Sequence, residues 1–338
     1  LDRGHFDEAA EALAAWAEDR APEVAIARAR LLTNQGDAAR ALAELSSVGE
    51  AVERAGDVEL GAFWSLHVAR ALLRAGDYAG AERRAAEVAE RLGARELLAG
   101  EGSDAPITER GLQILAEAAA MQGLSQSFAS RHEEARATLE RAVGLARRAR
   151  DPRSLSVALG SLAFALQRDE RLVEAKSAYE EALSAAEQAG DAGTMATTRL
   201  NLAGIAKLTG DLAAAIRHLE AAVDMGRRSG RMATLRQALL NLANLELYIG
   251  RIAKAGVSID ALAAERAALA PQQRAQLLAL EAEHAARSGD PGRATQLCAA
   301  CGEAYEAMGR RVDAVEARLE RALLLVGLPG ADARAISA

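Results

Sequence analysis

The sequence predicts an all-α fold: an α-α superhelix, or solenoid, of about 16 helices stacked in antiparallel pairs. Three observations predict it: the composition, a glycine-containing turn that recurs at a regular spacing, and a stripe of packing residues that follows every second turn. Half of the 338 residues are hydrophobic, but only 3% are aromatic and only six are proline. This composition favours helices that pack closely through alanine and leucine, and it offers few of the residues that form strands.

The recurring turn has the form Gly-Asp or Gly-Arg, and its members lie about 20 residues apart within each run, which fits one helix of about four turns plus a tight turn. Glycine can take the left-handed conformation that ends a helix, and the aspartate after it can cap the next helix. The members are Gly36-Asp37, Gly56-Asp57, Gly76-Asp77, Gly190-Asp191, Gly210-Asp211, Gly230-Arg231, Gly250-Arg251, Gly289-Asp290 and Gly309-Arg310.

A stripe of the form Ala, three residues, apolar, two residues, apolar follows every second turn. These spacings place its three members on one side of a helix, so the repeating unit is a pair of helices about 40 residues long. The stripes are Ala9, Leu13 and Trp16; Ala41, Leu45 and Val48; Ala81, Ala85 and Val88; Ala135, Leu139 and Ala142; Ala175, Tyr179 and Ala182; Ala215, Leu219 and Ala222; Ala255, Ile259 and Leu262; and Ala294, Cys298 and Cys301.

The first helix of each predicted pair carries a small residue about two turns before it ends. A small side chain at that place lets the two helices of a pair approach closely. These residues are Ala29, Ala69, Gly123, Ala163, Ala203, Ala243 and Ala282.

Together these patterns resemble the tetratricopeptide repeat. The segment Leu200-Asn201-Leu202-Ala203 followed by Gly210-Asp211 is a good match. The unit is longer than the usual 34 residues, and in this it resembles the repeats of kinesin light chain, of Pins-type adaptors and of bacterial signal-transduction ATPases similar to the maltose-regulon activator. The resemblance implies a protein that binds other molecules through its surface.

The domain organisation that we predict is one solenoid over residues 1–326 and a tail or linker over 327–338. The solenoid begins in the middle of a repeat, because residues 1–19 match only a second helix, and we therefore expect a piece of a longer chain. The spacing between the stripes at Ala81 and Ala135 is too long by about 14 residues, and Gly100, Gly102 and Pro106 fall in the excess. We expect an irregular insertion at 93–108, as a tolerated loop, a lid or a hinge.

Catalysis, cofactors and metals are not expected. The sequence has no phosphate-binding glycine loop and no nucleophile elbow, and its five histidines are dispersed without metal-ligand spacing. Cys298 and Cys301 are the only cysteines, too few for a zinc site. They occupy the stripe positions of Leu219 and Ala222, so we expect buried structural thiols.

Charge and hydropathy exclude other classes. The chain has 41 basic and 48 acidic residues, interspersed, for a net charge of −7, which argues against nucleic acid as a partner of this fragment. No apolar run approaches the roughly 18 residues of a spanning helix, and the first residues show no signal-peptide pattern. We expect a cytoplasmic protein that does not associate with membranes.

The resemblance implies that the first helices line a concave groove, where residues near the small packing residue face a ligand. Asn201 and Asn241 occupy equivalent positions, and an amide offers both a donor and an acceptor to a peptide backbone. The alternative is that these two residues tie neighbouring helices together. The candidate ligand-binding residues are Asn201, Lys207, Asn241, Asn244, Tyr248, Gln167, Arg168, His67, Arg70 and Arg74.

The function that we predict is a protein-protein interaction module of a larger signalling or regulatory protein, which binds an extended peptide or a partner helix in the groove. Its partner is a protein or peptide, which includes other domains of the same full-length chain. Two alternatives stay open: a sensor domain for a small effector, as in the regulators named above, and a scaffold for self-assembly. An apolar pocket favours the effector, and a long polar groove favours the peptide.

Overall fold

The structure, a computed structural model, describes residue 13 and residues 21–95, 97 and 107–327. Over these residues it holds fifteen α-helices and one short 3-10 helix, and no strand, which confirms the all-α solenoid. The chain divides into two compact units, Leu1–Thr234 and Leu235–Ala338. We call them unit 1 and unit 2 and describe each by itself.

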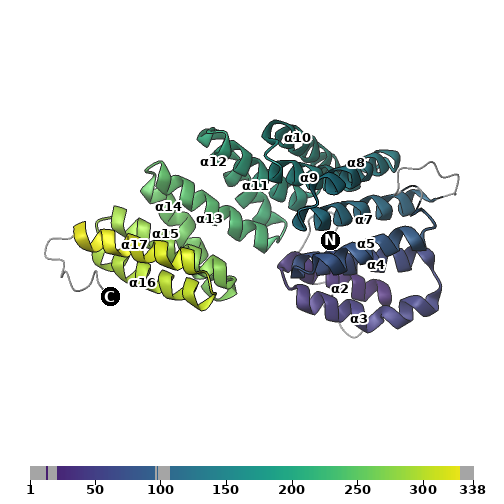
Figure 1. The fold of residues 1–338 in the computed structure, drawn as a ribbon, viewed down its shortest axis with the longest axis horizontal. Helices are drawn as coiled ribbons and strands as arrows, with labels where there is room; N and C mark the ends of the chain where they lie inside the picture. The colour runs from purple at the N-terminus through teal and green to yellow at the C-terminus, as the bar shows by residue number, and fades with distance from the viewer. Residues whose placement is uncertain (1–12, 14–20, 96, 98–106, 328–338) are drawn as a thin grey trace. The chain divides into compact units, whose positions relative to one another are not determined.

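The helices of unit 1 are α2 (Pro22–Gln35), α3 (Ala38–Ala55), α4 (Val58–Ala75), α5 (Tyr78–Arg91), α7 (Glu109–Phe128), α8 (His132–Arg148), α9 (Pro152–Arg168), α10 (Leu172–Ala189), α11 (Ala192–Leu208) and α12 (Leu212–Arg228) (Figure 1). Helix α13 (Met232–Tyr248) begins at the end of unit 1 and continues into unit 2. The helices that follow in unit 2 are α14 (Ile252–Ala264), the 3-10 helix (Arg266–Ala268), α15 (Pro271–Arg287), α16 (Pro291–Ala307) and α17 (Arg311–Gly327).

The helices of unit 1 form the pairs α2–α3, α4–α5, α7–α8, α9–α10 and α11–α12, and each pair packs on the next. The first helices also contact one another directly, α2 with α4, α4 with α7, α7 with α9 and α9 with α11. The first helices therefore form the inner layer of this unit, as the repeat pattern predicts. In unit 2, α15 pairs with α16, and α14 and α17 pack on either side of that pair.

The predicted turns are confirmed. Every glycine of the recurring turn has a positive φ, from 62° at Gly230 to 92° at Gly36. The aspartate that follows is the N-cap of the next helix wherever it is present, and its carboxylate accepts a hydrogen bond from a backbone N–H three residues on, as Asp191 does from Thr194 at 2.9 Å.

Three turns of the same kind carry no glycine and were missed by the sequence pattern. Ser130, Arg150 and Glu170 have φ values of 59°, 51° and 60°, and they continue the 20-residue spacing down from Gly190. A left-handed conformation is costly for residues with a Cβ, so the fold itself holds these three turns.

The predicted stripes are buried throughout the described residues. Ala135, Leu139 and Ala142 are all 0% exposed, and the other described stripes are nearly as closed. The small residues of the first helices are buried as well. Gly123 shows why: a Cβ built on it would lie 2.5 Å from Cγ of Leu139 on the partner helix. Small residues are thus required where the two helices of a pair approach closely.

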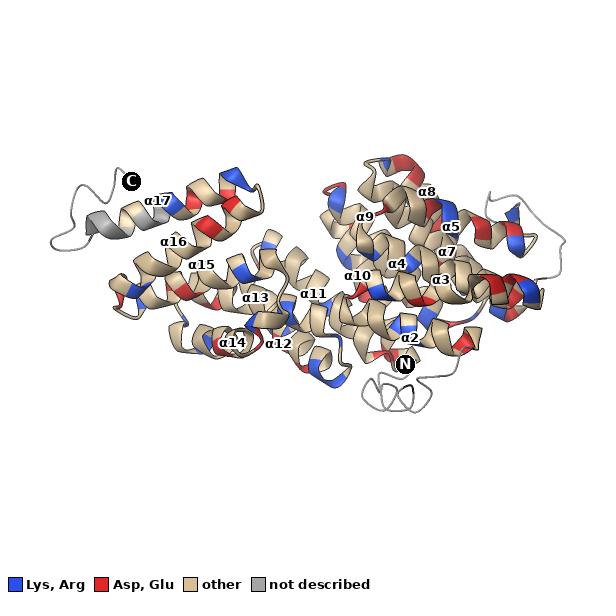
Figure 2. Ribbon diagram, turned by 90° about the horizontal axis from the view of Figure 1, so that it is seen from below, with Lys and Arg blue, Asp and Glu red and all other residues tan. Residues whose placement is uncertain are grey.

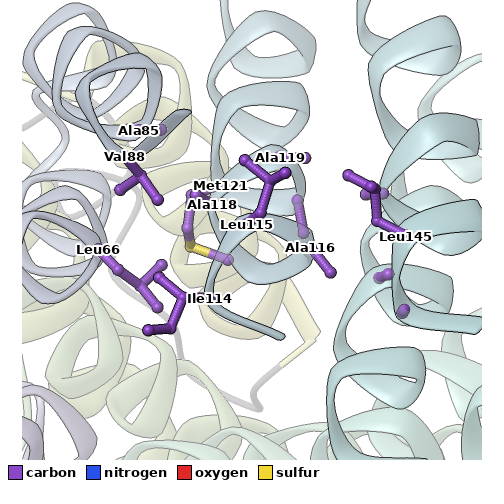
Figure 3. Close-up of a cluster of buried hydrophobic side chains, with 14 of the residues drawn as sticks. Leu66, Ala85, Val88, Ile114, Leu115, Ala116, Ala118, Ala119, Met121 and Leu145 are labelled. Atoms are coloured by element: carbon purple, nitrogen blue, oxygen red, sulfur yellow. The ribbon is translucent and has the colours of Figure 1, made fainter. Parts of the chain in front are cut away.

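A continuous core runs from one repeat of unit 1 to the next. Figure 3 shows Leu66 of α4, Val88 of α5, Leu115 of α7 and Leu145 of α8 within one cluster of buried side chains. Burial of this kind is the main stabilising term in a repeat array, because each pair of helices leaves one side open for its neighbour.

Several predicted features fall largely outside the described residues: the stripe at Ala9 and Trp16, most of the insertion at 93–108, and the tail at 328–338. The described segments on either side of the insertion are α5, which ends at Arg91, and α7, which Thr108 caps through a hydrogen bond to the backbone of Gly111.

Candidate binding surfaces

A cleft of about 760 Å³ opens in unit 2 among α13, α15, α16 and α17. Its walls carry both predicted asparagines of α13, together with other polar and apolar side chains. The lining residues are Leu240, Asn241, Asn244, Gln276, Ala279, Leu280, Ala282, Glu283, Ala286, Pro291, Cys298, Tyr305 and Leu323.

The amides of α13 are accessible on the cleft wall. Asn241 and Asn244 are both exposed, and Asn241 Oδ1 accepts a hydrogen bond from Nε2 of Gln237 at 3.1 Å. The Asn241 amide nitrogen keeps its donor capacity toward a ligand. Gln276 and Glu283 of α15 add acceptors in the same cleft, and Leu240 and Leu280 add apolar surface. The arrangement can pair with a peptide backbone and hold apolar side chains.

Tyr248 is not among the residues that line this cleft. It lies at the last position of α13 and its side chain is 71% exposed. Its part in ligand binding stays a prediction.

The inner side of unit 1 has a different chemistry. His67 of α4 is only 3% exposed, its ring contacts Phe63 edge-on at 4.5 Å between centroids, and its Nε2 has no hydrogen-bond partner. Burial, and then the charges of Arg70 and Arg30, hold its pKa well below the ordinary value. His67 is therefore neutral, and a ligand would meet only a small part of its ring.

Arg70 and Arg74 follow on the same helix, one turn apart. Arg70 Nη2 donates to Oε2 of Glu117 on α7 at 2.5 Å, and both side chains are mostly buried. Arg74 is exposed. Desolvation, followed by the charge of Arg70, lowers the pKa of Arg74, which shows that its guanidinium lies in a hollow with protein around it.

The predicted residues of α9 have contacts within the protein. Gln167 Oε1 accepts a hydrogen bond from the hydroxyl of the buried Tyr179 at 3.3 Å. The guanidinium of Arg168 lies 5.4 Å from the ring centroid of Phe128 and 5.9 Å from that of Phe164. Both residues thus stabilise the packing of unit 1, and a role in ligand binding stays a prediction.

On α11, Asn201 is half-buried and Lys207 is exposed. Asn201 belongs to unit 1 and Asn241 to unit 2. Each precedes the small residue of its helix by two positions, Ala203 in one case and Ala243 in the other. Their expected joint action on one ligand stays a prediction.

Sequence reasoning missed Arg231, which lies directly after the turn glycine Gly230. Its side chain is 25% exposed and reaches the start of α11, where its Nη2 lies 4.0 Å from Oδ1 of Asp191. Arg153 of α9 approaches the same carboxylate, with Nε 3.9 Å from Oδ2. The signal that could have found Arg231 is the replacement of the usual aspartate by arginine at this turn.

Both cysteines are buried and free, as predicted, at 3% exposure for Cys298 and 2% for Cys301. Cys301 Sγ donates to the carbonyl oxygen of Ala275 at 3.4 Å. Over the described part of the chain, no group of three or more His, Cys, Asp or Glu side chains is placed to hold a metal ion. No described helix combines the length and the apolar character needed to cross a bilayer.

Residues 154–228 match the family model described as the tetratricopeptide repeat. No curated protein matches the chain in sequence. Among solved structures the fold is similar to that of a Rap protein complexed with competence and sporulation factor, at a TM-score of 0.58 and 13% identity over 95% of this chain and 93% of that one. The apo form of the quorum sensor NprR from B. thuringiensis gives a TM-score of 0.52 and 11% identity over 95% and 98%.

A STAND protein with a tetratricopeptide repeat sensor from Pyrococcus horikoshii also matches, at a TM-score of 0.47 and 15% identity over 90% of this chain and 42% of that one. At these identities, similarity to solved structures shows the fold. The repeat pattern, the family match and the fold agree, and the chain contains tetratricopeptide repeats as predicted.

Proposed function

We propose that this tetratricopeptide-repeat solenoid is the protein-interaction module of a signalling or regulatory protein, and that it binds an extended peptide or a partner helix against its first helices. The observation that carries the proposal is the cleft of unit 2, in which the exposed amides of Asn241 and Asn244 stand beside the apolar surface of Leu240 and Leu280. An extended peptide presents backbone donors and acceptors alternately, and an amide side chain can pair with either.

The fold supports a binding role rather than a catalytic one. Tetratricopeptide solenoids present a long surface built from many short repeats, which suits recognition of an extended partner. A protein of similar fold, the Rap protein named above, is complexed with competence and sporulation factor. The proposed partner of this chain is likewise a peptide or protein.

A small effector is the second candidate ligand, because the volume of the cleft is within the range of about 300–1,000 Å³ that is usual for small-molecule pockets. The two candidates differ in how far the contacts extend. A peptide also contacts residues outside the cleft, whereas a small effector is held by the lining residues alone.

The test begins with a displayed library of random peptides selected on the whole chain. Replacing Asn241 and Asn244 together by alanine should weaken binding of a selected peptide by about 1–3 kcal/mol, because each lost amide leaves backbone groups of the ligand unpaired. Gln188→Ala is the matched control, since Gln188 is an exposed amide on the second helix α10. Unchanged affinity in the double variant, with peptide bound elsewhere, would refute the proposed site.

Asn201→Ala, made separately, tests whether the equivalent amide of unit 1 takes part. If Asn201 instead ties helices together, this variant lowers the unfolding temperature of the free protein and leaves peptide affinity unchanged.

A further inference from the structure

The inner side of unit 1 collects arginines from three separate places in the chain. Arg70 and Arg74 come from α4, Arg153 from the start of α9, and Arg231 from the turn before α13. Figure 2 shows basic and acidic side chains interspersed over the helices of this unit, so a local excess of one sign is notable. The carboxylates beside these arginines are Glu117, which pairs with Arg70, and Asp191.

Arg231 is held in place by a gap in the surface of α11. A Cβ built on the buried Gly193 would lie 2.1 Å from Nε of Arg231 and 2.9 Å from its Cζ. The arginine side chain therefore crosses the first turn of α11 over Gly193, in space that any larger residue would fill. Gly193 lies inside a helix, without a positive φ, so the close approach of Arg231 is the physical reason for glycine here.

Asp191 does not satisfy the guanidinium of Arg231. Its Oδ1 accepts from the backbone N–H of Thr194 at 2.9 Å, and its Oδ2 accepts from the Thr194 hydroxyl at 3.0 Å. The distance of 4.0 Å to Arg231 is too long for a hydrogen bond. Among the described residues, no acceptor forms a hydrogen bond with Arg231.

Arg74 is in the same condition. No described residue forms a hydrogen bond or an ion pair with its guanidinium, although Arg70, one turn before it, has Glu117. Desolvation lowers the pKa of Arg231, the charge of Asp191 raises it, and the charges of Arg74, Arg70 and Arg153 lower it again. The guanidinium groups of Arg74 and Arg231 thus lie close enough to repel each other across the inner side of unit 1.

Two partly desolvated guanidinium groups without acceptors form an unfavourable arrangement until an anion enters between them. A guanidinium presents its N–H groups in a planar fork that matches the two oxygens of a carboxylate. The chain as a whole has a net charge of −7, so its overall field repels anions, and binding of an anion here must come from this local cluster.

We propose that Arg74 and Arg231, with Arg70 beside them, form a carboxylate-binding subsite on the inner side of unit 1, which holds an acidic side chain or the C-terminal carboxylate of a bound peptide. This inference rests on the proposed function and adds to it the chemistry of the ligand: the partner peptide is acidic where it contacts unit 1.

The test uses fluorescein-labelled hexaglutamate, with hexaglutamine as the neutral probe, and measures fluorescence anisotropy on the whole chain at low ionic strength. Hexaglutamate binds and hexaglutamine does not. Arg74→Ala and Arg231→Ala each weaken hexaglutamate by about 10-fold or more, because each removes a charge-assisted pair. Arg148→Ala is the matched control, since Arg148 is an exposed arginine of α8 without an ion pair among the described residues, and it leaves the affinity unchanged.

Gly193→Ala tests the geometry without removing a charge. The added methyl group displaces the Arg231 side chain, so this variant weakens hexaglutamate about as much as Arg231→Ala and has no further effect when combined with it. Circular dichroism establishes that each variant is folded, and Arg231→Lys, which keeps the charge and the space but loses the planar fork, gives an intermediate loss.

The free C-terminus is distinguished from the side chains by comparing hexaglutamate with its C-terminal amide: equal affinity assigns the subsite to acidic side chains, and a loss of about 10-fold assigns it to the terminal carboxylate. Absence of hexaglutamate binding to the wild-type chain, or equal affinity in Arg74→Ala, Arg231→Ala and Arg148→Ala, overturns the subsite. Neither result affects the binding of neutral peptides to the cleft of unit 2, so the two proposals fail separately.

Discussion

Tyr179 of α10 and Cys298 of α16 occupy the same position of the repeat in the two units, four residues after the alanine that begins the stripe. In unit 1, Tyr179 is completely buried among residues of α9 and α11, such as Ala163 and Leu202. In unit 2, Cys298 is buried too, but it forms part of the wall of a cleft. The comparison teaches that the repeat fixes which position is buried, while the size of the side chain there decides whether the space is filled or left open to a ligand.

Tyr179→Ala should produce the largest effect, a loss of about 3–5 kcal/mol in the free energy of unfolding, because it removes a whole aromatic side chain from a closed core. Urea denaturation followed by circular dichroism measures the loss. Tyr179→Phe removes only the hydroxyl that donates to Gln167, and it should cost about 0.5–1.5 kcal/mol. A loss below about 2 kcal/mol for the alanine variant would contradict the view that this position organises unit 1.

Replacing Cys298 and Cys301 together by alanine should cost less, about 1–3 kcal/mol, since the two buried thiols are small. The same denaturation experiment applies, and elemental analysis of the purified wild-type protein should find no bound zinc. Stoichiometric zinc in the protein, or a loss as large as that of Tyr179→Ala, would show that the two positions are not equivalent in the way described.

The position two residues before the small residue of the first helix sharpens the comparison through pH. It is the buried His67 in unit 1 and Asn241 or Leu280 in unit 2, and only the histidine titrates. The pKa of His67 is held well below its ordinary value by burial and then by Arg70 and Arg30. The unfolded chain binds a proton near pH 6.5 and the folded chain does not, so stability present above about pH 6.5 is lost as pH falls toward the folded-state pKa.

The expected slope approaches about 1.4 kcal/mol per pH unit in that window. Urea denaturation at pH 7.5, 6.5 and 5.5 measures it, and His67→Asn should remove this part of the pH dependence. If the variant retains the full slope, His67 is not the group responsible.

The turn that precedes each of these second helices gives the smallest effect and carries opposite signs in the two units. Glu170 before α10 has a φ of 60°, whereas the equivalent residue before α16 is Gly289 with a φ of 85°. Glu170→Gly should stabilise the chain by about 1 kcal/mol and Gly289→Ala should destabilise it by a similar amount, because a left-handed conformation is strained for a residue with a Cβ. Thermal unfolding of the two variants checks the signs, and two shifts in the same direction would contradict this account.

Much of the fold could be predicted because the constraints on packing residues are local. A glycine that ends a helix, an aspartate that caps the next one and a small residue at a close helix contact each leave a mark at a fixed spacing in the sequence. Gly123 and the stripe of Ala135, Leu139 and Ala142 are examples that the structure confirms. The turns at Ser130, Arg150 and Glu170 escaped because neighbouring packing holds their backbone where no glycine marks it.

The candidate sites could be predicted only in part. The sequence placed Asn241 and Asn244 on a binding surface, and the structure lines a cleft with both, but the size of that cleft depends on side chains from four helices that are far apart in the chain. The amino-acid sequence by itself thus determined the repeat, its helices and its buried stripes, since each of these depends on residues within about one repeat of one another.

Only the tertiary structure decided that Arg231 lies over Gly193 and opposes Arg74, because charges separated by four helix pairs interact only after the repeats have stacked and enclosed them on the inner side of one unit.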